Sequence, residues 1–153
     1  MINVTTKIQL KQLYERDENL WLEETVRLLK ENCLDELDLE NLIEELESLG
    51  KRDKNRVESF LRQIIIHLLL LEYWTEEYEY NYRHWRGEIA TFKVQINKYL
   101  TTNLKNYLSE ELENIYQDAV FIVTEKTGLN KSIFSEKCCY LLEQLLDKNW
   151  LPN

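Results

Sequence analysis

Apolar residues recur three or four positions apart along most of the chain, which is the spacing that places them on one face of an α-helix. The clearest example lies between Asp38, which is placed to cap a helix, and Gly50, which is placed to end it in the left-handed conformation. The spacing predicts a helix here whose apolar face packs in the core. That face carries Leu39, Leu42, Ile43, Leu46 and Leu49.

An earlier helix is predicted from Asp17, a suitable N-cap, to Glu31. It has two apolar stripes, and a helix that is apolar on two sides is expected to pack on both. One stripe contains Leu20, Trp21 and Leu28 beside Glu24, and the other contains Leu22, Val26 and Leu29.

Four further helices are predicted downstream, and neither strand-like alternation nor an internal repeat interrupts them. The first of them is apolar all round in its middle, which is typical of a central helix or of one that meets a second subunit. The chain is therefore predicted to be all-α, a single-domain helical bundle of about five or six helices. The four segments are 53–78, 85–99, 104–126 with Gly128 as its stop, and 141–147.

Composition supports a folded helical chain, because 44% of the 153 residues are hydrophobic and only three are Gly and one is Pro. The net charge of −9 disfavours nucleic acid and anionic membranes as partners. The three Cys form no Cys-x-x-Cys pair, and the N-terminus lacks a signal-peptide pattern. The longest apolar run, 64–71, is too short to span a bilayer. We therefore expect a cytoplasmic protein with no membrane and no nucleic-acid partner.

Several motifs follow one another in a fixed order. They are LYERD at 13–17 with WLEE at 21–24, LDLENLIEELESLG at 37–50, WRGEI at 85–89, and LLEQLLDKNWLP at 141–152. Together with a Leu-rich helix that carries a His, this pattern resembles domain-of-unknown-function family 29, an uncharacterised all-α family found mostly in cyanobacteria.

The resemblance implies one all-α domain over 13–152 behind an N-terminal extension at 1–12, and it implies no activity. Two features depart from the family pattern: Glu18 replaces a usual aromatic residue, and the segment before the final helix has no Pro. The positions that carry the family motif are Trp21, Glu24, Asp38, Asn41, Leu42, Glu44, Glu45, Glu47, Gly50, His67, Trp85, Arg86 and Gly87.

The acidic motif raises the question of a metal site, because hard cations bind carboxylate oxygens. Carboxylate-bridged bundles combine inward-facing Glu residues with a Glu-x-x-His motif, which this chain lacks. The basic run that follows Gly50 favours instead a solvated face whose charges pair with neighbours, with no metal or cofactor. A carboxylate-rich metal-binding protein with hydrolytic activity stays as the alternative. Its ligands would be Glu24, Glu44, Glu45 and Glu47, with His67 at the periphery.

Two residue types could carry other chemistry. His67 is expected to lie at the edge of the core, bonded to Asp38 or to a backbone carbonyl, although a histidine also suits a general base or a pH switch. Cys138 and Cys139 precede the last helix, where a thiolate can be activated, but no His or Asp pattern pairs with them. No catalytic residue is predicted, and the sequence favours a protein that is not an enzyme.

The segment 73–87 is dense in aromatic residues and arginine, which pack in cores and also anchor protein interfaces. With the all-round apolar helix, it favours a non-enzymatic protein-interaction module that binds an unidentified protein or a second copy of itself. An antitoxin or adaptor encoded beside its partner is a further alternative. The predicted interface residues are Tyr78, Tyr80, Tyr82, Arg83 and Trp85.

Overall fold

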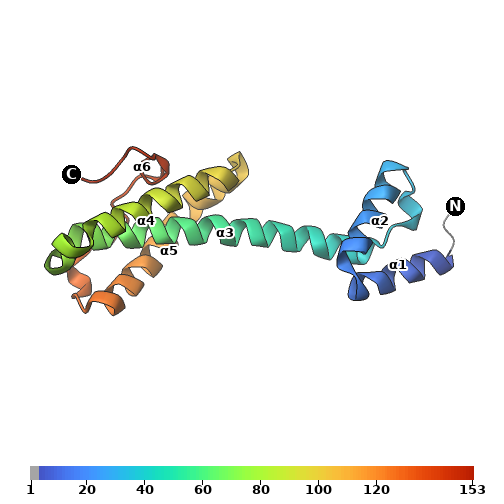
Figure 1. Ribbon diagram of the computed structural model, residues 1–153, viewed down its shortest axis with the longest axis horizontal. Helices are drawn as coiled ribbons and strands as arrows, with labels where there is room; N and C mark the ends of the chain where they lie inside the picture. Colours follow the sequence, from blue (N-terminus) through green and yellow to red (C-terminus); the bar gives the residue numbers. More distant parts are fainter. Residues whose placement is uncertain (1–3) are drawn as a thin grey trace. The chain divides into compact units, whose positions relative to one another are not determined.

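The computed structural model describes the backbone of residues 4–153 and the side chains from Lys7 onward (Figure 1). Over this range it has helices and no strand, which confirms the predicted all-α bundle of five or six helices. The α-helices are α1 (Val4–Arg16), α2 (Glu18–Lys30), α3 (Leu39–Tyr73), α4 (Tyr78–Tyr99), α5 (Thr102–Thr127) and α6 (Leu142–Leu146). Single turns of 3-10 helix are η1 (Leu34–Glu36), η2 (Thr75–Glu77) and η3 (Lys131–Ile133).

The chain divides into two compact units, unit 1 over 1–51 and unit 2 over 52–153. Helix α1 occupies most of the segment that the sequence suggests is an extension. The prediction of one domain over 13–152 stays a prediction. No helix in the described part of the chain is long and apolar enough to cross a membrane.

Several helix ends follow the expected capping rules. Asp17 caps α2, since its side chain accepts a hydrogen bond from the Leu20 amide at 3.1 Å. Thr101 caps α5 in the same way through the Leu104 amide. Gly128 ends α5 with a φ of 74°, the left-handed conformation that glycine adopts without steric cost. The predicted boundaries at Asp17 and Gly128 are therefore confirmed.

The predicted helix end at Gly50 is wrong. Helix α3 continues through Gly50, which has no positive φ, and it ends only at Tyr73. Glycine inside a helix costs only about 0.5–1 kcal/mol, and the polar residues that follow, such as Lys51 and Arg52, are good helix formers. Two predicted helices are therefore one. The predicted connection between the helices at 53–78 and 85–99 is shorter than expected, because α3 ends at Tyr73, η2 follows, and α4 already begins at Tyr78.

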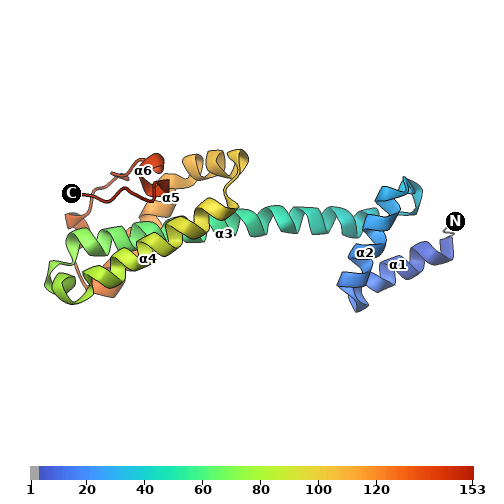
Figure 2. The ribbon, with the colours of Figure 1, turned by 45° about the horizontal axis from the view of Figure 1, so that its top comes forward.

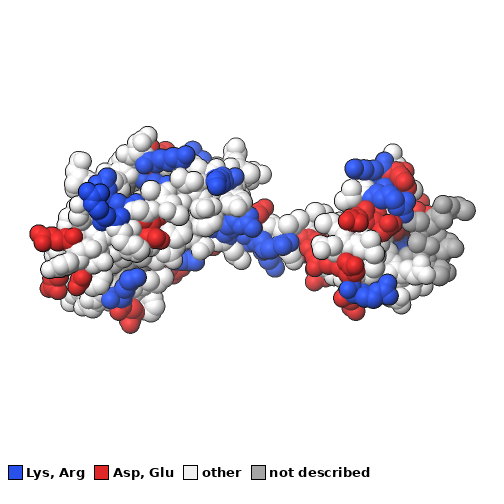
Figure 3. All heavy atoms as spheres, viewed as in Figure 1, with Lys and Arg blue, Asp and Glu red and all other residues white. Residues whose placement is uncertain are grey.

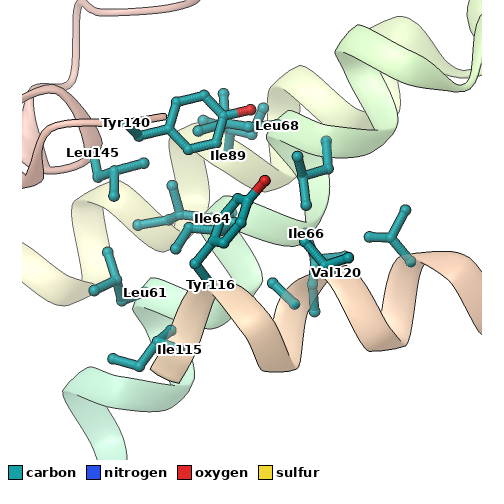
Figure 4. Close-up of a cluster of buried hydrophobic side chains, with 14 of the residues drawn as sticks. Leu61, Ile64, Ile66, Leu68, Ile89, Ile115, Tyr116, Val120, Tyr140 and Leu145 are labelled. Atoms are coloured by element: carbon teal, nitrogen blue, oxygen red, sulfur yellow. The ribbon is translucent and has the colours of Figure 1, made fainter. Parts of the chain in front are cut away.

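The core of unit 2 lies between the C-terminal half of α3 and helices α4, α5 and α6. Figures 1 and 2 both show α4 running back along this half of α3. Residues from all four helices meet in one cluster of twenty-one buried hydrophobic side chains (Figure 4). The all-round apolar middle of α3 is confirmed as central to its unit, because residues 64–70 are all buried.

One charged side chain is buried in unit 2. Lys93 on α4 is fully buried, and its Nζ donates to the backbone oxygens of Gln144 at 3.3 Å and of Asp147 and Trp150 at 2.7 Å. Three acceptors match the three N–H groups of an ammonium. Burial lowers the pKa of Lys93, and the nearby Asp147 carboxylate opposes that shift. Lys93 thus holds the end of α6 and the segment after it against α4.

The core of unit 1 is much smaller. Its buried hydrophobic residues among those described are Leu10, Trp21, Leu28 and Leu37, with Tyr14 and Leu42 among the half-buried residues around them. The rings of Tyr14 and Trp21 meet edge to face at 4.8 Å. A core of this size stabilises a helical unit only marginally.

Candidate functional site

Asp38 is the centre of a buried polar group in unit 1. It is 3% exposed, and its Oδ2 accepts from the indole of Trp21 at 3.3 Å and from the side-chain amide of Asn41 at 2.6 Å. Its Oδ1 is buried without a hydrogen-bond partner in the described part of the chain. Three residues of the family motif therefore meet here and join α2 to the first turn of α3.

A second hydrogen bond ties α1 to α3. The Tyr14 hydroxyl donates to Glu45 Oε2 at 2.8 Å, and this bond raises the pKa of Tyr14 to about 12. Leu42 is half-buried against the same core. Glu45, Asn41 and Leu42 thus face into unit 1, and this is the side of α3 that the unit uses for its own packing.

The rest of the apolar face predicted for this part of α3 is exposed. Its four residues are about half accessible to solvent, so the expectation that they pack in the core is wrong for them. The pattern of the sequence correctly places them on one face, but unit 1 covers only the edge of that face, at Leu42. We call these four residues the aliphatic stripe: Leu39 (55%), Ile43 (54%), Leu46 (58%) and Leu49 (45%).

Helix α2 shows the same division. The face with Trp21, Thr25 and Leu28 is buried, whereas the second predicted stripe lies at the surface. Ten of the eighteen large hydrophobic residues that are exposed in the described chain belong to unit 1, although this unit is only a third of the chain. The second stripe of α2 consists of Leu22, Val26 and Leu29, each at least 40% exposed.

Unit 1 also carries most of the negative charge. Its sequence has thirteen Asp and Glu and six Lys and Arg, a formal charge of −7 out of −9 for the whole chain. Between residues 31 and 50 there is no Lys or Arg. Carboxylates are visible over the face of this unit in Figure 3. Glu44 and Glu47 are exposed, and Glu40 forms an exposed ion pair with Lys11 at 2.9 Å.

The aromatic patch predicted as an interface, Tyr78 to Trp85, lies at the start of α4. Tyr80 is 85% exposed, Tyr78 stacks on Tyr82 at 5.3 Å, and the Arg83 guanidinium lies 5.4 Å from the Tyr82 ring. Trp85 is only 3% exposed and stacks on Trp74, so it can support the patch from below but offers no contact surface. The interface itself stays a prediction. Arg86 and Gly87 are exposed on the following turn.

His67 occupies the core-edge position expected for it. It is 8% exposed, its ring lies 5.9 Å from that of Phe92, and its Nδ1 is 2.7 Å from the Gln63 carbonyl oxygen. This bond confirms the expected backbone partner, and Asp38 is not that partner. Desolvation lowers the pKa of His67, although the hydrogen bond to Gln63 opposes the shift.

The cysteines show no sign of activation. Burial raises the pKa of Cys138 to about 11, and it also raises the pKa of Cys139 and of Cys33. The Cys138 amide donates to Glu113 at 2.8 Å, which places a carboxylate beside the segment. A thiol with a raised pKa is a poor nucleophile near neutral pH.

The carboxylates that the metal-binding hypothesis predicts as ligands are ion-paired, hydrogen-bonded or exposed to solvent. Glu24 pairs with Arg27 at 3.0 Å, and Glu45 accepts from Tyr14, whereas Glu44 and Glu47 point to solvent. Within the described residues, no group of three His, Cys, Asp or Glu side chains could hold a metal ion.

The exposed stripes are the main feature that sequence reasoning missed. The periodicity of these stripes is visible in the sequence. The sequence also shows more apolar stripes in this part of the chain than its few other residues can cover. The buried Lys93 gave no signal, because a lysine between Phe92 and Val94 reads as an ordinary polar position on an amphipathic helix.

The fold and surface together define a class: an all-α protein with an acidic helical unit that exposes an aliphatic face, followed by a larger helical unit with a complete core. The model of a protein family, the domain of unknown function DUF29, matches residues 13–151, and the chain belongs to this family. No curated protein and no solved structure matches the chain.

Proposed function

We propose that this chain is a non-enzymatic protein-interaction module of the cytoplasm, whose partner is another protein or a second copy of itself. The observation that supports this proposal is the aliphatic stripe of α3, four residues at helical spacing that are each about half exposed. Exposed apolar residues in a row are typical of interaction sites, whereas single exposed ones are common on any surface.

The energetics of unit 1 point the same way. The unit buries four hydrophobic side chains and leaves ten large ones exposed among those described. Covering a Leu or Ile side chain contributes about 1.5–3 kcal/mol. A partner seated on the stripe would therefore supply stabilisation that the unit's own core lacks.

Photo-crosslinking in the cells that make the protein tests the proposal. A photoreactive amino acid is placed at Leu46 in the stripe, at Tyr80 in the aromatic patch, and at Leu141, which is 62% exposed in unit 2 and serves as the matched control. We expect one discrete adduct from position 46 and none from position 141. Adducts that are absent or identical at all three positions would contradict the proposal.

The aromatic patch is the second candidate surface of the same function. Tyr80 and Tyr82 supply amphipathic rings, and Arg83 supplies a charge beside them, the residue types that dominate binding energy. Replacing Tyr80 and Tyr82 with Ala is expected to weaken association while the helical circular-dichroism signal stays unchanged. Association that is equally strong in the double variant would remove this patch from the proposal.

A further inference from the structure

We infer that the aliphatic stripe of α3 binds an amphipathic helix with basic edges, contributed by a partner protein. This inference rests on the proposed function and specifies the chemistry of its partner. The stripe runs over eleven residues, from Leu39 to Leu49, or about 15 Å along the helix axis. A straight aliphatic ridge of this kind fits the groove between side chains of another helix.

The charge around the stripe selects the partner. Glu40, Ile43 and Glu47 are three and four positions apart and so share one face of α3, which places two carboxylates along an edge of the stripe. Both are exposed. Glu40 is paired with Lys11 of α1 at 2.9 Å, whereas Glu47 lies in a segment, 31–50, that has no basic residue. Lys or Arg at the edges of a partner helix would complement this edge.

The same charges disfavour a second copy on this face. Two copies that paired antiparallel through their stripes would place their acidic edges side by side, and Lys11 offsets only the charge of Glu40, so the Glu47 carboxylates would repel each other. Unit 1 as a whole has a formal charge of −7, so the repulsion extends beyond the stripe. A basic amphipathic helix thus complements both the apolar face and the acidic edge.

Three labelled peptides of about 18 residues, long enough to form helix on binding, test the inference with the full chain. The first has Leu at helical spacing and Lys or Arg elsewhere. The second has the same composition in an order that disperses Leu around the helix, and the third keeps the Leu pattern with Glu at the edges. Fluorescence anisotropy at near-physiological salt is expected to show at least about tenfold tighter binding of the first peptide.

Variants of the chain locate the binding. Ile43→Asp and Leu46→Asp are at exposed positions, so they should fold, and they are expected to weaken binding of the first peptide about tenfold or more. Leu141→Asp, at an exposed apolar position of unit 2, is the control and is expected to change binding less than about twofold. Glu40→Gln with Glu47→Gln is expected to weaken it about threefold at low salt and less at high salt.

Three results would overturn the inference. They are equal binding of the first two peptides, binding that Leu46→Asp leaves unchanged, and sedimentation of the chain alone as a dimer that Leu46→Asp dissociates. The last result would assign the stripe to a second copy. If crosslinking at position 46 captures a protein that the first peptide does not displace, the interaction module stands and only its partner chemistry fails.

Discussion

Replacement of Lys93 by Met tests whether a buried ammonium holds the C-terminal segment of unit 2. Methionine keeps the length and apolar character of the lysine stem and removes only the charged group. Without it, the carbonyl oxygens of Gln144, Asp147 and Trp150 lose the donor that lies 2.7–3.3 Å from them. The Lys93 Nζ also lies 5.4 Å from the centre of the Trp150 ring, and this attraction disappears as well.

The magnitude follows from two opposing effects. Each hydrogen bond to a charged group contributes about 1.5–3 kcal/mol, and three are lost. The variant also avoids the cost of burying an ammonium, which is several kcal/mol. We expect the free energy of unfolding to fall by about 2–4 kcal/mol, which corresponds to a melting temperature about 4–16 °C lower for a chain of this length.

Urea unfolding followed by circular dichroism and tryptophan fluorescence measures this change. Lys98→Met, at an exposed position five residues further along α4, is the matched control and is expected to change stability by less than about 0.5 kcal/mol. Hydrogen exchange should also show that amides from residue 145 onward lose protection in the Lys93 variant first. A Lys93→Met chain as stable as the Lys98→Met chain would refute the assignment of an anchoring role to this ammonium.

Three other perturbations have defined outcomes. Asp38→Ala removes the acceptor for the Trp21 indole and is expected to lower the free energy of unfolding by about 1–3 kcal/mol and to change the fluorescence of that tryptophan. An unchanged spectrum and an unchanged stability would contradict the role of the carboxylate. Gly50→Ala is expected to stabilise α3 by about 0.5–1 kcal/mol, because a Cβ at this position meets nothing within 4 Å and the φ of Gly50 is not positive. A loss of stability on thermal melting would show that the helix does not continue through this residue. Iodoacetamide at pH 8 is expected to alkylate exposed Cys139 before Cys138, because the raised pKa of Cys138, about 11, leaves little thiolate at that pH. The reverse order of alkylation in mass spectrometry would indicate that the Cys138 thiol is activated.

The helical faces of this protein were predictable because they depend on local spacing. Asp17 caps the start of α2 and Gly128 ends α5, as capping chemistry predicts, and the buried middle of α3 was predictable from its continuous apolar run. The continuation of α3 through Gly50 was not predictable, because a single glycine weakens a helix by an amount that its neighbours offset.

The surface site was only half predictable. Spacing places Leu39, Ile43 and Leu46 on one face, but it contains no information about what covers that face. Burial depends on tertiary packing, and unit 1 has too few other elements to enclose every apolar stripe that its sequence contains. The contacts around Asp38 were similarly hidden, since its partner Trp21 is seventeen residues away on another helix.

The small core of unit 1 also bears on how long the protein persists in a cell. Segments with few buried apolar contacts open more often than the rest of a chain, so the amides of α2 are expected to exchange faster than those of α5. Proteases act on such open states. A ligand that binds only the closed state lowers the population of open states by a factor that grows with the ratio of the free ligand concentration to the dissociation constant. If the proposed partner binds the aliphatic stripe, the abundance of the chain would follow the abundance of that partner, and copies without a partner would be removed first.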